Sequence, residues 1–172
     1  MSYIKNSLAE NEEIIEYFYL NKYMYFPIYL VLFFRFAMIG YGLYLLSLPP
    51  EEKFLEIIPN LYAGSALSII GLLLSLKSVY NLFYFKSMDM GLTNRRIVLK
   101  TGIIAINTKE LRLQAIETVE VKQGALDRIL GFGDVYITGR GNSIIIYKGV
   151  EDPVYIKKKI ASMLNNKDQA EN

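Results

Sequence analysis

The sequence predicts an α+β protein, in which a two-helix transmembrane hairpin precedes a small antiparallel β-barrel or sandwich with a C-terminal capping helix. Two observations carry this prediction. The hydrophobic residues, which make up 52% of the 172-residue chain, are concentrated in its first half. From Met88 onward the pattern changes to short β-rich stretches separated by turns that contain glycine. We therefore expect two physically different parts rather than a single globule.

Two long apolar runs make up the first part. Residues 26–48 contain a single charge and, at about 1.5 Å per helical residue, are long enough to cross a hydrocarbon core of roughly 30 Å. Residues 59–85 contain no charge except Lys77, whose long side chain can extend to the membrane interface. We expect both runs to be transmembrane helices, so that residues 26–86 form a hairpin.

The charges that flank these runs predict their orientation. Lys53 in the connecting segment is outnumbered by glutamates, whereas Lys22 and Lys86 lie beside the opposite ends of the runs. Positive residues are typically retained on the cytoplasmic side of a membrane. We therefore expect a multi-pass protein of the inner cell membrane with both termini in the cytoplasm.

Two features inside the hairpin are candidates for contacts within the membrane. Arg35 lies about 13 Å into the first run, and neither run contains an acidic residue that would neutralise it. Its guanidinium must therefore reach hydroxyl groups, free carbonyls or a lipid phosphate, in either a structural or a functional role. The second run carries small residues at helical spacing, which allow close helix packing within the hairpin or between copies. They are Gly64, Ser68, Gly71, Ser75 and Ser78.

The segment before the hairpin, residues 1–25, is polar, acidic and rich in tyrosine. Leu8, Ile14, Ile15 and Phe18 share one side of a possible amphipathic helix over residues 8–20. Such a helix would lie on the inner membrane surface or pack on the soluble part, and the sequence leaves both alternatives open. A cleaved signal peptide is not expected, because this segment lacks a basic start followed at once by an apolar core.

Residues 87–164 show the strand pattern of the second part. Short β-rich stretches recur at intervals of about eight to twelve residues, as in small antiparallel barrels and sandwiches. Asp152 and Pro153, a good N-cap and first-turn pair, then begin a helix with one apolar face. The polar residues 165–172 are expected to form a disordered tail. The expected strands are 96–100, 103–107, 109–113, 116–122, 134–138 and 143–147.

The composition excludes most catalytic and metal-binding chemistry. The chain contains no cysteine, histidine or tryptophan, so thiolate metal sites, cysteine nucleophiles and imidazole-based mechanisms are absent. Residues 131–134, GFGD, lack the lysine and hydroxyl that follow in a phosphate-binding loop. A net charge of +2 without a basic stripe argues against a nucleic-acid partner. We expect no enzyme activity, no catalytic residues, no cofactor, no metal and no small-molecule substrate.

The second part also resembles a known family. The segments LTNRRIVLKTGII, LRLQAIETVEVKQGALDRILGFGDVYI and GVEDPVYIKKKI follow one another as in the bacterial pleckstrin-homology-like (PH-like) domain of the YdbS-like membrane proteins, formerly a domain of unknown function. The similarity covers about residues 88–164, and the two preceding helices fit the layout of the family. The resemblance implies a seven-stranded, strongly bent β-barrel that is closed at one end by the C-terminal helix and faces the cytoplasm.

These features predict a noncatalytic adaptor or scaffold, anchored in the lipid bilayer, that binds an unidentified membrane-associated protein or self-associates. Two alternatives stay open. In the first, an accessory subunit of a membrane transporter or envelope stress system uses Arg35 and the small residues of the second run. In the second, the PH-like domain binds anionic lipid headgroups through basic residues. The candidates are Lys86, Arg95, Arg96, Lys157, Lys158 and Lys159.

Overall fold

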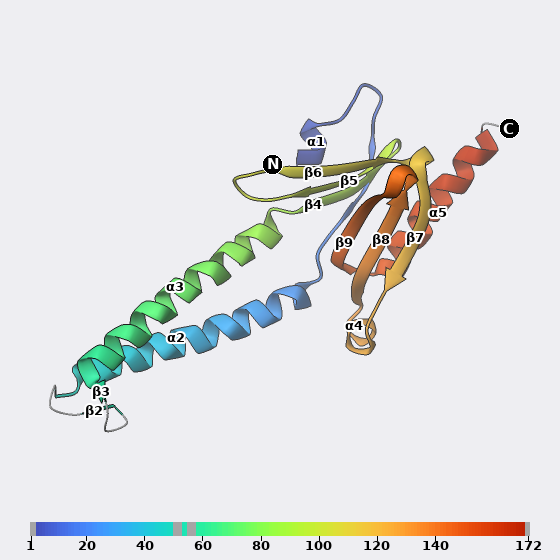
Figure 1. Cartoon of the computed structure of the whole chain (residues 1–172). Helices are drawn as coiled ribbons and strands as arrows, with labels where there is room; N and C mark the ends of the chain where they lie inside the picture. The colour runs from blue at the N-terminus through green and yellow to red at the C-terminus, as the bar shows by residue number, and fades with distance from the viewer. Residues whose placement is uncertain (1–2, 50–52, 55–57, 171–172) are drawn as a thin grey trace. The chain divides into compact units, whose positions relative to one another are not determined.

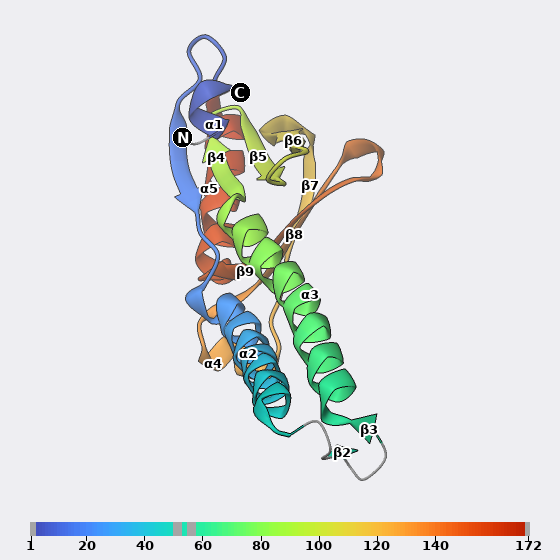
Figure 2. The ribbon, with the colours of Figure 1, turned by 90° about the vertical axis from the view of Figure 1, so that its left-hand side faces the viewer.

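The structure, a computed structural model, describes residues 3–49, 53–54 and 58–170, which form two compact units (Figures 1 and 2). One unit, the helical hairpin, comprises residues 25–83, and the other, the β domain, comprises residues 3–24 and 84–170. The elements are α1 (Tyr3–Asn6), β1 (Ile14–Phe18), α2 (Phe26–Ser47), β2 (Lys53–Phe54), β3 (Ile58–Pro59), α3 (Asn60–Lys86), β4 (Asp89–Thr93), β5 (Arg96–Thr101), β6 (Asn107–Arg112), β7 (Ile116–Lys122), α4 (Ala125–Ile129), β8 (Phe132–Gly139), β9 (Ser143–Glu151) and α5 (Pro153–Ala170).

The helical hairpin consists of α2 and α3, which form at the positions of the two apolar runs. By length and composition both helices can cross a membrane. They pack where both backbones carry small residues. A Cβ atom added to Gly42 would lie 2.8 Å from the carbonyl oxygen of Gly64, and one added to Gly64 would lie 2.6 Å from that of Gly42. Only glycine allows this approach, so Gly42 and Gly64 serve packing between α2 and α3.

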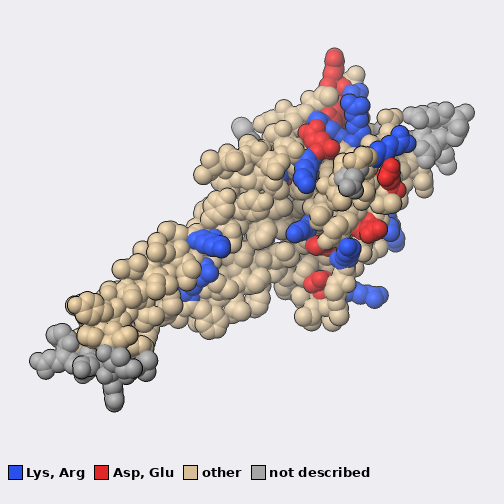
Figure 3. All heavy atoms as spheres, in the orientation of Figure 1, with Lys and Arg blue, Asp and Glu red and all other residues tan. Residues whose placement is uncertain are grey.

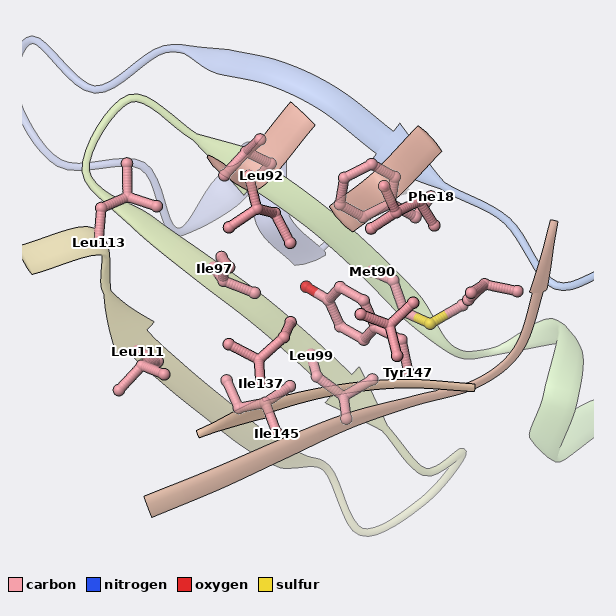
Figure 4. Packing of buried hydrophobic residues seen from close by; sticks show 14 residues of the cluster. Phe18, Met90, Leu92, Ile97, Leu99, Leu111, Leu113, Ile137, Ile145 and Tyr147 are labelled. Carbon is pink, nitrogen blue, oxygen red and sulfur yellow. The ribbon is translucent and has the colours of Figure 1, made fainter. Parts of the chain in front are cut away.

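The β domain contains two antiparallel sheets, ordered β1-β4-β5-β6 and β7-β8-β9. Their facing sides, together with Ile156 and Ile160 of α5, enclose the hydrophobic core. Tyr147 is fully buried in it, and its hydroxyl donates toward the carbonyl oxygens of Gly91, at 3.1 Å, and Val98, at 2.8 Å. Figure 4 shows this side chain among core residues from both sheets. The expected α+β fold of sheets followed by a packed helix is therefore present.

The first strand of the four-stranded sheet comes from the segment before the hairpin. β1 pairs antiparallel with β4 and places Phe18 opposite Met90, with both side chains buried. The amphipathic helix expected over residues 8–20 is therefore wrong, whereas packing on the soluble part is correct. The physical reason is that, as a strand, the segment pairs its backbone with β4 and at the same time buries Phe18 in the hydrophobic core. The β domain is consequently larger than the expected residues 87–164.

Two further expectations about local structure are wrong. Residues 103–107 were expected to form a strand, but β5 ends at Thr101 and β6 begins at Asn107. Gly102, with φ +96°, turns the chain between them in a conformation that glycine adopts readily. The other error concerns residues 165–170, because α5 continues to Ala170 where a disordered tail was expected. Residues 171 and 172 of that expected tail lie outside the described residues.

The contribution of β1 to the core generates the first testable prediction. We expect residues 84–170 alone to unfold without a cooperative transition, whereas residues 1–24 joined to them by a flexible linker restore one. Within the linked polypeptide, Phe18→Ala should lower the free energy of unfolding by about 3–5 kcal/mol, as for other buried aromatic deletions. Chemical denaturation followed by circular dichroism measures both effects. Equal stability of the two polypeptides would show that β1 is dispensable.

Candidate functional site

The chain leaves the β domain for α2 and returns from α3 at the same end of the sheet. β1 ends at Phe18, which lies opposite Met90, whereas its first residue Ile14 lies opposite Thr93. β4 begins at Asp89, three residues after the end of α3 at Lys86. We call the end of the β domain that contains Phe18, Asp89 and Thr101 the root end, and the opposite end the far end. The N–H of Asn21 donates to the carbonyl of Gly149 at 2.9 Å, which fixes the chain just before α2 at the root end.

The far end contains a buried carboxylate. Glu12 is only 6% exposed, and its carboxylate accepts hydrogen bonds from the Thr93 hydroxyl at 2.7 Å and from Nε and Nη2 of Arg96, each at 2.9 Å. The N–H of Ala9 donates to it as well, at 2.9 Å. Arg96 also donates to Glu110 and, at 2.6 Å, to the carbonyl of Ser7. Arg96 therefore joins the N-terminal segment to β5 and β6.

These contacts change the acidity of both charged groups. Burial of the Glu12 carboxyl opposes its ionisation, but the hydrogen bonds from Ala9, Thr93 and Arg96 and the positive charge of Arg96 outweigh burial and lower its pKa. Burial of Arg96 acts against its charge, and the carboxylates of Glu12 and Glu110 more than compensate, so its pKa is raised. The pair is therefore charged at neutral pH.

The turn between β4 and β5 completes this arrangement. The hydroxyl of Thr93 accepts from the backbone N–H of Arg96 at 2.9 Å while it donates to Glu12. Asn94 binds the N-terminal segment through both ends of its amide: its oxygen accepts from the N–H of Glu13 and its nitrogen donates to the carbonyl of Asn11, each at 3.2 Å. The sequence Thr-Asn-Arg-Arg at 93–96 is thus a clamp that holds the segment before the hairpin.

Beside this clamp lies a recess of about 450 Å³. Exposed Arg95 and Arg112 contribute to its lining, together with Gln114 and Ala9. Within its lining, the charge of Arg96 is balanced by Glu12 and Glu110, whereas exposed Arg95 and Arg112 add positive charge. The chemistry of this recess suits a small anion or a carboxylate side chain.

The structure does not bring the headgroup candidates together. Lys86 lies at the root end, while Arg95 and Arg96 lie at the far end, separated by the five residues of β4 or about 16 Å of strand. Arg96 is bonded within the clamp. Of the lysines in α5, Lys157 and Lys158 are exposed, and Nζ of Lys159 lies 3.8 Å from the carboxylate of Glu16. Figure 3 shows basic and acidic side chains interspersed over the β domain.

Of the candidates in the helical hairpin, Arg35 and Ser78 meet. Arg35 donates to the carbonyl oxygen of Leu74 and to the hydroxyl of Ser78. Ser75 instead donates to the carbonyl of Gly71 in its own helix, at 2.7 Å. A Cβ atom on Gly71 would lie 2.7 Å from Ile39, so this glycine also packs on α2. Ser68 faces Gly42, and among the described residues its buried hydroxyl oxygen has no hydrogen-bond partner.

Sequence reasoning missed Glu12 as part of a site. Its partners Thr93 and Arg96 lie beyond the entire hairpin, and a single glutamate in an acidic segment carries no spacing signal. The only available signal was the sequence Thr-Asn-Arg-Arg at 93–96, which belongs to the first segment of the family resemblance. It indicated a family but did not indicate that these residues bind Glu12.

Comparison with known proteins identifies one family. The family model described as "Bacterial PH domain" matches residues 33–166, which is most of the chain. No curated protein and no solved structure matches.

The lowered pKa of Glu12 predicts how stability depends on pH. A group whose pKa is lower in the folded state stabilises the fold above its unfolded pKa, about 4.3 for Glu, and this contribution is lost as the pH falls through the folded pKa. In the linked polypeptide, Glu12→Gln should lower the free energy of unfolding at neutral pH by about 1–3 kcal/mol. The difference from wild type should shrink below about pH 4.

The matched control is Glu13→Gln, because Glu13 is exposed and is bonded to Asn94 through its backbone N–H and carbonyl groups. We expect this variant to be as stable as wild type in urea titrations at each pH. A deficit of Glu12→Gln that stays constant down to pH 3 would contradict the role of the Glu12 charge.

Proposed function

The chain belongs to the bacterial PH domain family, and we propose that it is a noncatalytic adaptor anchored in a membrane by α2 and α3. In this proposal the β domain lies on the cytoplasmic side and binds a membrane-associated protein or a second copy of the chain. Domains of this kind are generally binding modules rather than enzymes.

The observation that carries the proposal is the insertion of the hairpin between two paired strands. The chain leaves after β1 and re-enters at β4, which are neighbours in one sheet. A segment that leaves and re-enters a folded domain on one side of a membrane crosses that membrane an even number of times. Two apolar helices of sufficient length satisfy this requirement. The positive charges of Lys22 and Lys86 at the connections then favour the cytoplasmic side.

A free strand edge supports protein binding by the β domain. β7 pairs with β8, and no other strand of the described residues pairs with its second edge. Val119 and Val121 face the core, whereas Glu117 and Glu120 are exposed. A partner that adds a strand here would bind mainly through main-chain hydrogen bonds.

The two alternatives receive less support. An accessory role in a transporter would use Arg35, but its hydrogen bonds to Leu74 and Ser78 lie within the hairpin. Headgroup binding by the β domain would need its basic residues on one surface, and Lys86 and Arg95 lie at opposite ends of β4.

Membrane topology is the first test of the proposal. The chain has no native cysteine, so single cysteines report unambiguously. In intact bacteria, Ser143→Cys should resist a membrane-impermeant thiol reagent, whereas Ile58→Cys, between the two helices, should react. Permeabilised cells provide the control, because there the exposed residue 143 should react too. Labelling of residue 143 in intact cells would refute the cytoplasmic placement.

Partner binding is the second test. A photo-crosslinking amino acid at Glu117 or Glu120 should give a discrete adduct in native membranes, which mass spectrometry identifies as a protein or a second copy. The same amino acid at exposed Lys158 of α5 is the matched control and should give none. Adducts from Lys158 but not from β7 would exclude the β7 edge as the binding surface.

A further inference from the structure

The exposed aliphatic side chains of the β domain are concentrated in two loops. The turn between β5 and β6 exposes Ile103, Ile104 and Ile106, and Ile104 is 90% exposed. The segment between β7 and β8 exposes Leu126, Ile129 and Leu130, of which Leu126 and Ile129 are 72% and 80% exposed. Exposed apolar clusters of this kind, unlike scattered single residues, indicate contact with a partner or a membrane.

Strand register places the first loop at the root end. Lys100 lies opposite Asp89, the first residue of β4, so the turn after Thr101 extends beyond the start of β4. Nζ of Lys100 donates to the carbonyl of Ser87 at 2.8 Å, directly after the end of α3. The isoleucines therefore lie beside the connection to α3.

The second loop lies at the same end. Phe132, the first residue of β8, is paired with Glu151, whose N–H donates to the carbonyl of Tyr19 at 3.1 Å. Leu20 forms a bridge with Val150 just before the connection to α2. Because α4 joins β7 to β8, it projects beyond these strands at the root end (Figure 1). The far-end turns differ, since they carry polar residues such as Asn94, Gln114 and Arg140.

We infer that the root end of the β domain is a bilayer-contacting surface, in which Ile104 and its neighbours and Leu126 and Ile129 insert into the interfacial region of the membrane. The inference rests on the proposed membrane anchoring by α2 and α3. A lipid interface suits the two apolar loops better than a protein partner does. Both loops lie beside the connections to α2 and α3, and these helices are apolar enough to enter a membrane.

Three exposed basic residues at the root end suit this occupant, and they lie among acidic ones such as Glu151 and Asp152. Lys22 and Lys86 lie at the two connections, and Arg128 lies between Leu126 and Ile129 in the sequence. Apolar side chains interspersed with basic ones bind an anionic leaflet through buried area and electrostatic attraction together. With both loops in contact with the bilayer, the far end of the β domain and the clamp would be directed away from the lipid.

The test uses the full chain in vesicles of phosphatidylcholine with a minority of phosphatidylglycerol. Single cysteines replace Ile104 or Ile129 and carry an environment-sensitive fluorophore. Lipids with a nitroxide near the headgroup serve as quenchers for residues 104, 129 and 144, and lipids with a nitroxide deep in the acyl chain serve as quenchers for residue 73. The matched control is Ile144→Cys, which carries the same label on an exposed isoleucine of the far end. Leu73→Cys in α3 reports separately on whether the hairpin lies in lipid.

We expect labels at residues 104 and 129 to shift their emission to shorter wavelength and to be quenched about twofold or more relative to residue 144. Labels that behave like residue 144 while residue 73 is quenched by lipid would overturn the inference and leave the anchoring intact. An unquenched label at residue 73 would instead refute the anchoring itself. Blue-shifted emission at residues 104 and 129 without quenching by lipid would assign these loops to a protein contact and also overturn the inference.

Discussion

Strand β1 pairs with β4 although the whole helical hairpin lies between them in the sequence, and the other features of the chain depend on this pairing. It completes the four-stranded sheet, places Phe18 against the ring of Tyr147 with centroids 5.7 Å apart, and covers the edge of β4. It also fixes the beginning and the end of the hairpin at one end of the β domain. The even number of crossings in the proposed anchoring and the proposed root-end surface both depend on that constraint.

The clamp at residues 93–96 adds to the contacts that hold β1. β1 lies at the edge of its sheet, so among the described strands it pairs only with β4. The ion pair between Glu12 and Arg96 and the two amide hydrogen bonds of Asn94 hold the preceding segment. β1 comes before the hairpin in the chain and can pair only when β4 is present. The chain between them must close into a loop, at a cost in entropy, before the β1–β4 contact lowers the free energy. Folding of the β domain is thereby linked to completion of the hairpin.

The parts of the fold that the sequence predicted are those whose signal is local. Long apolar runs predicted α2 and α3 to within about two residues, and short β-rich stretches between turns predicted the strands from β7 to β9. β1 was missed because Ile14, Ile15 and Phe18 fit a helical face as well as a strand, and only the distant β4 decides between them. The run at 103–106 looked like a strand by composition, yet Gly102 turns the chain there, and its isoleucines became the exposed surface of the root end. The Glu12 site could not be predicted, because Glu12 and its partners Thr93 and Arg96 come together only when β1 pairs with β4.

Hydrogen exchange of the full chain in lipid nanodiscs tests the β1–β4 pairing most directly. Amides of residues 14–18 should be as strongly protected as those of residues 89–93, because both strands belong to one cooperative unit. Fast exchange of residues 14–18 beside protected strands β5 to β9 would contradict the account. In that case residues 14–18 would not be part of the four-stranded sheet, and the hairpin would not connect two paired strands.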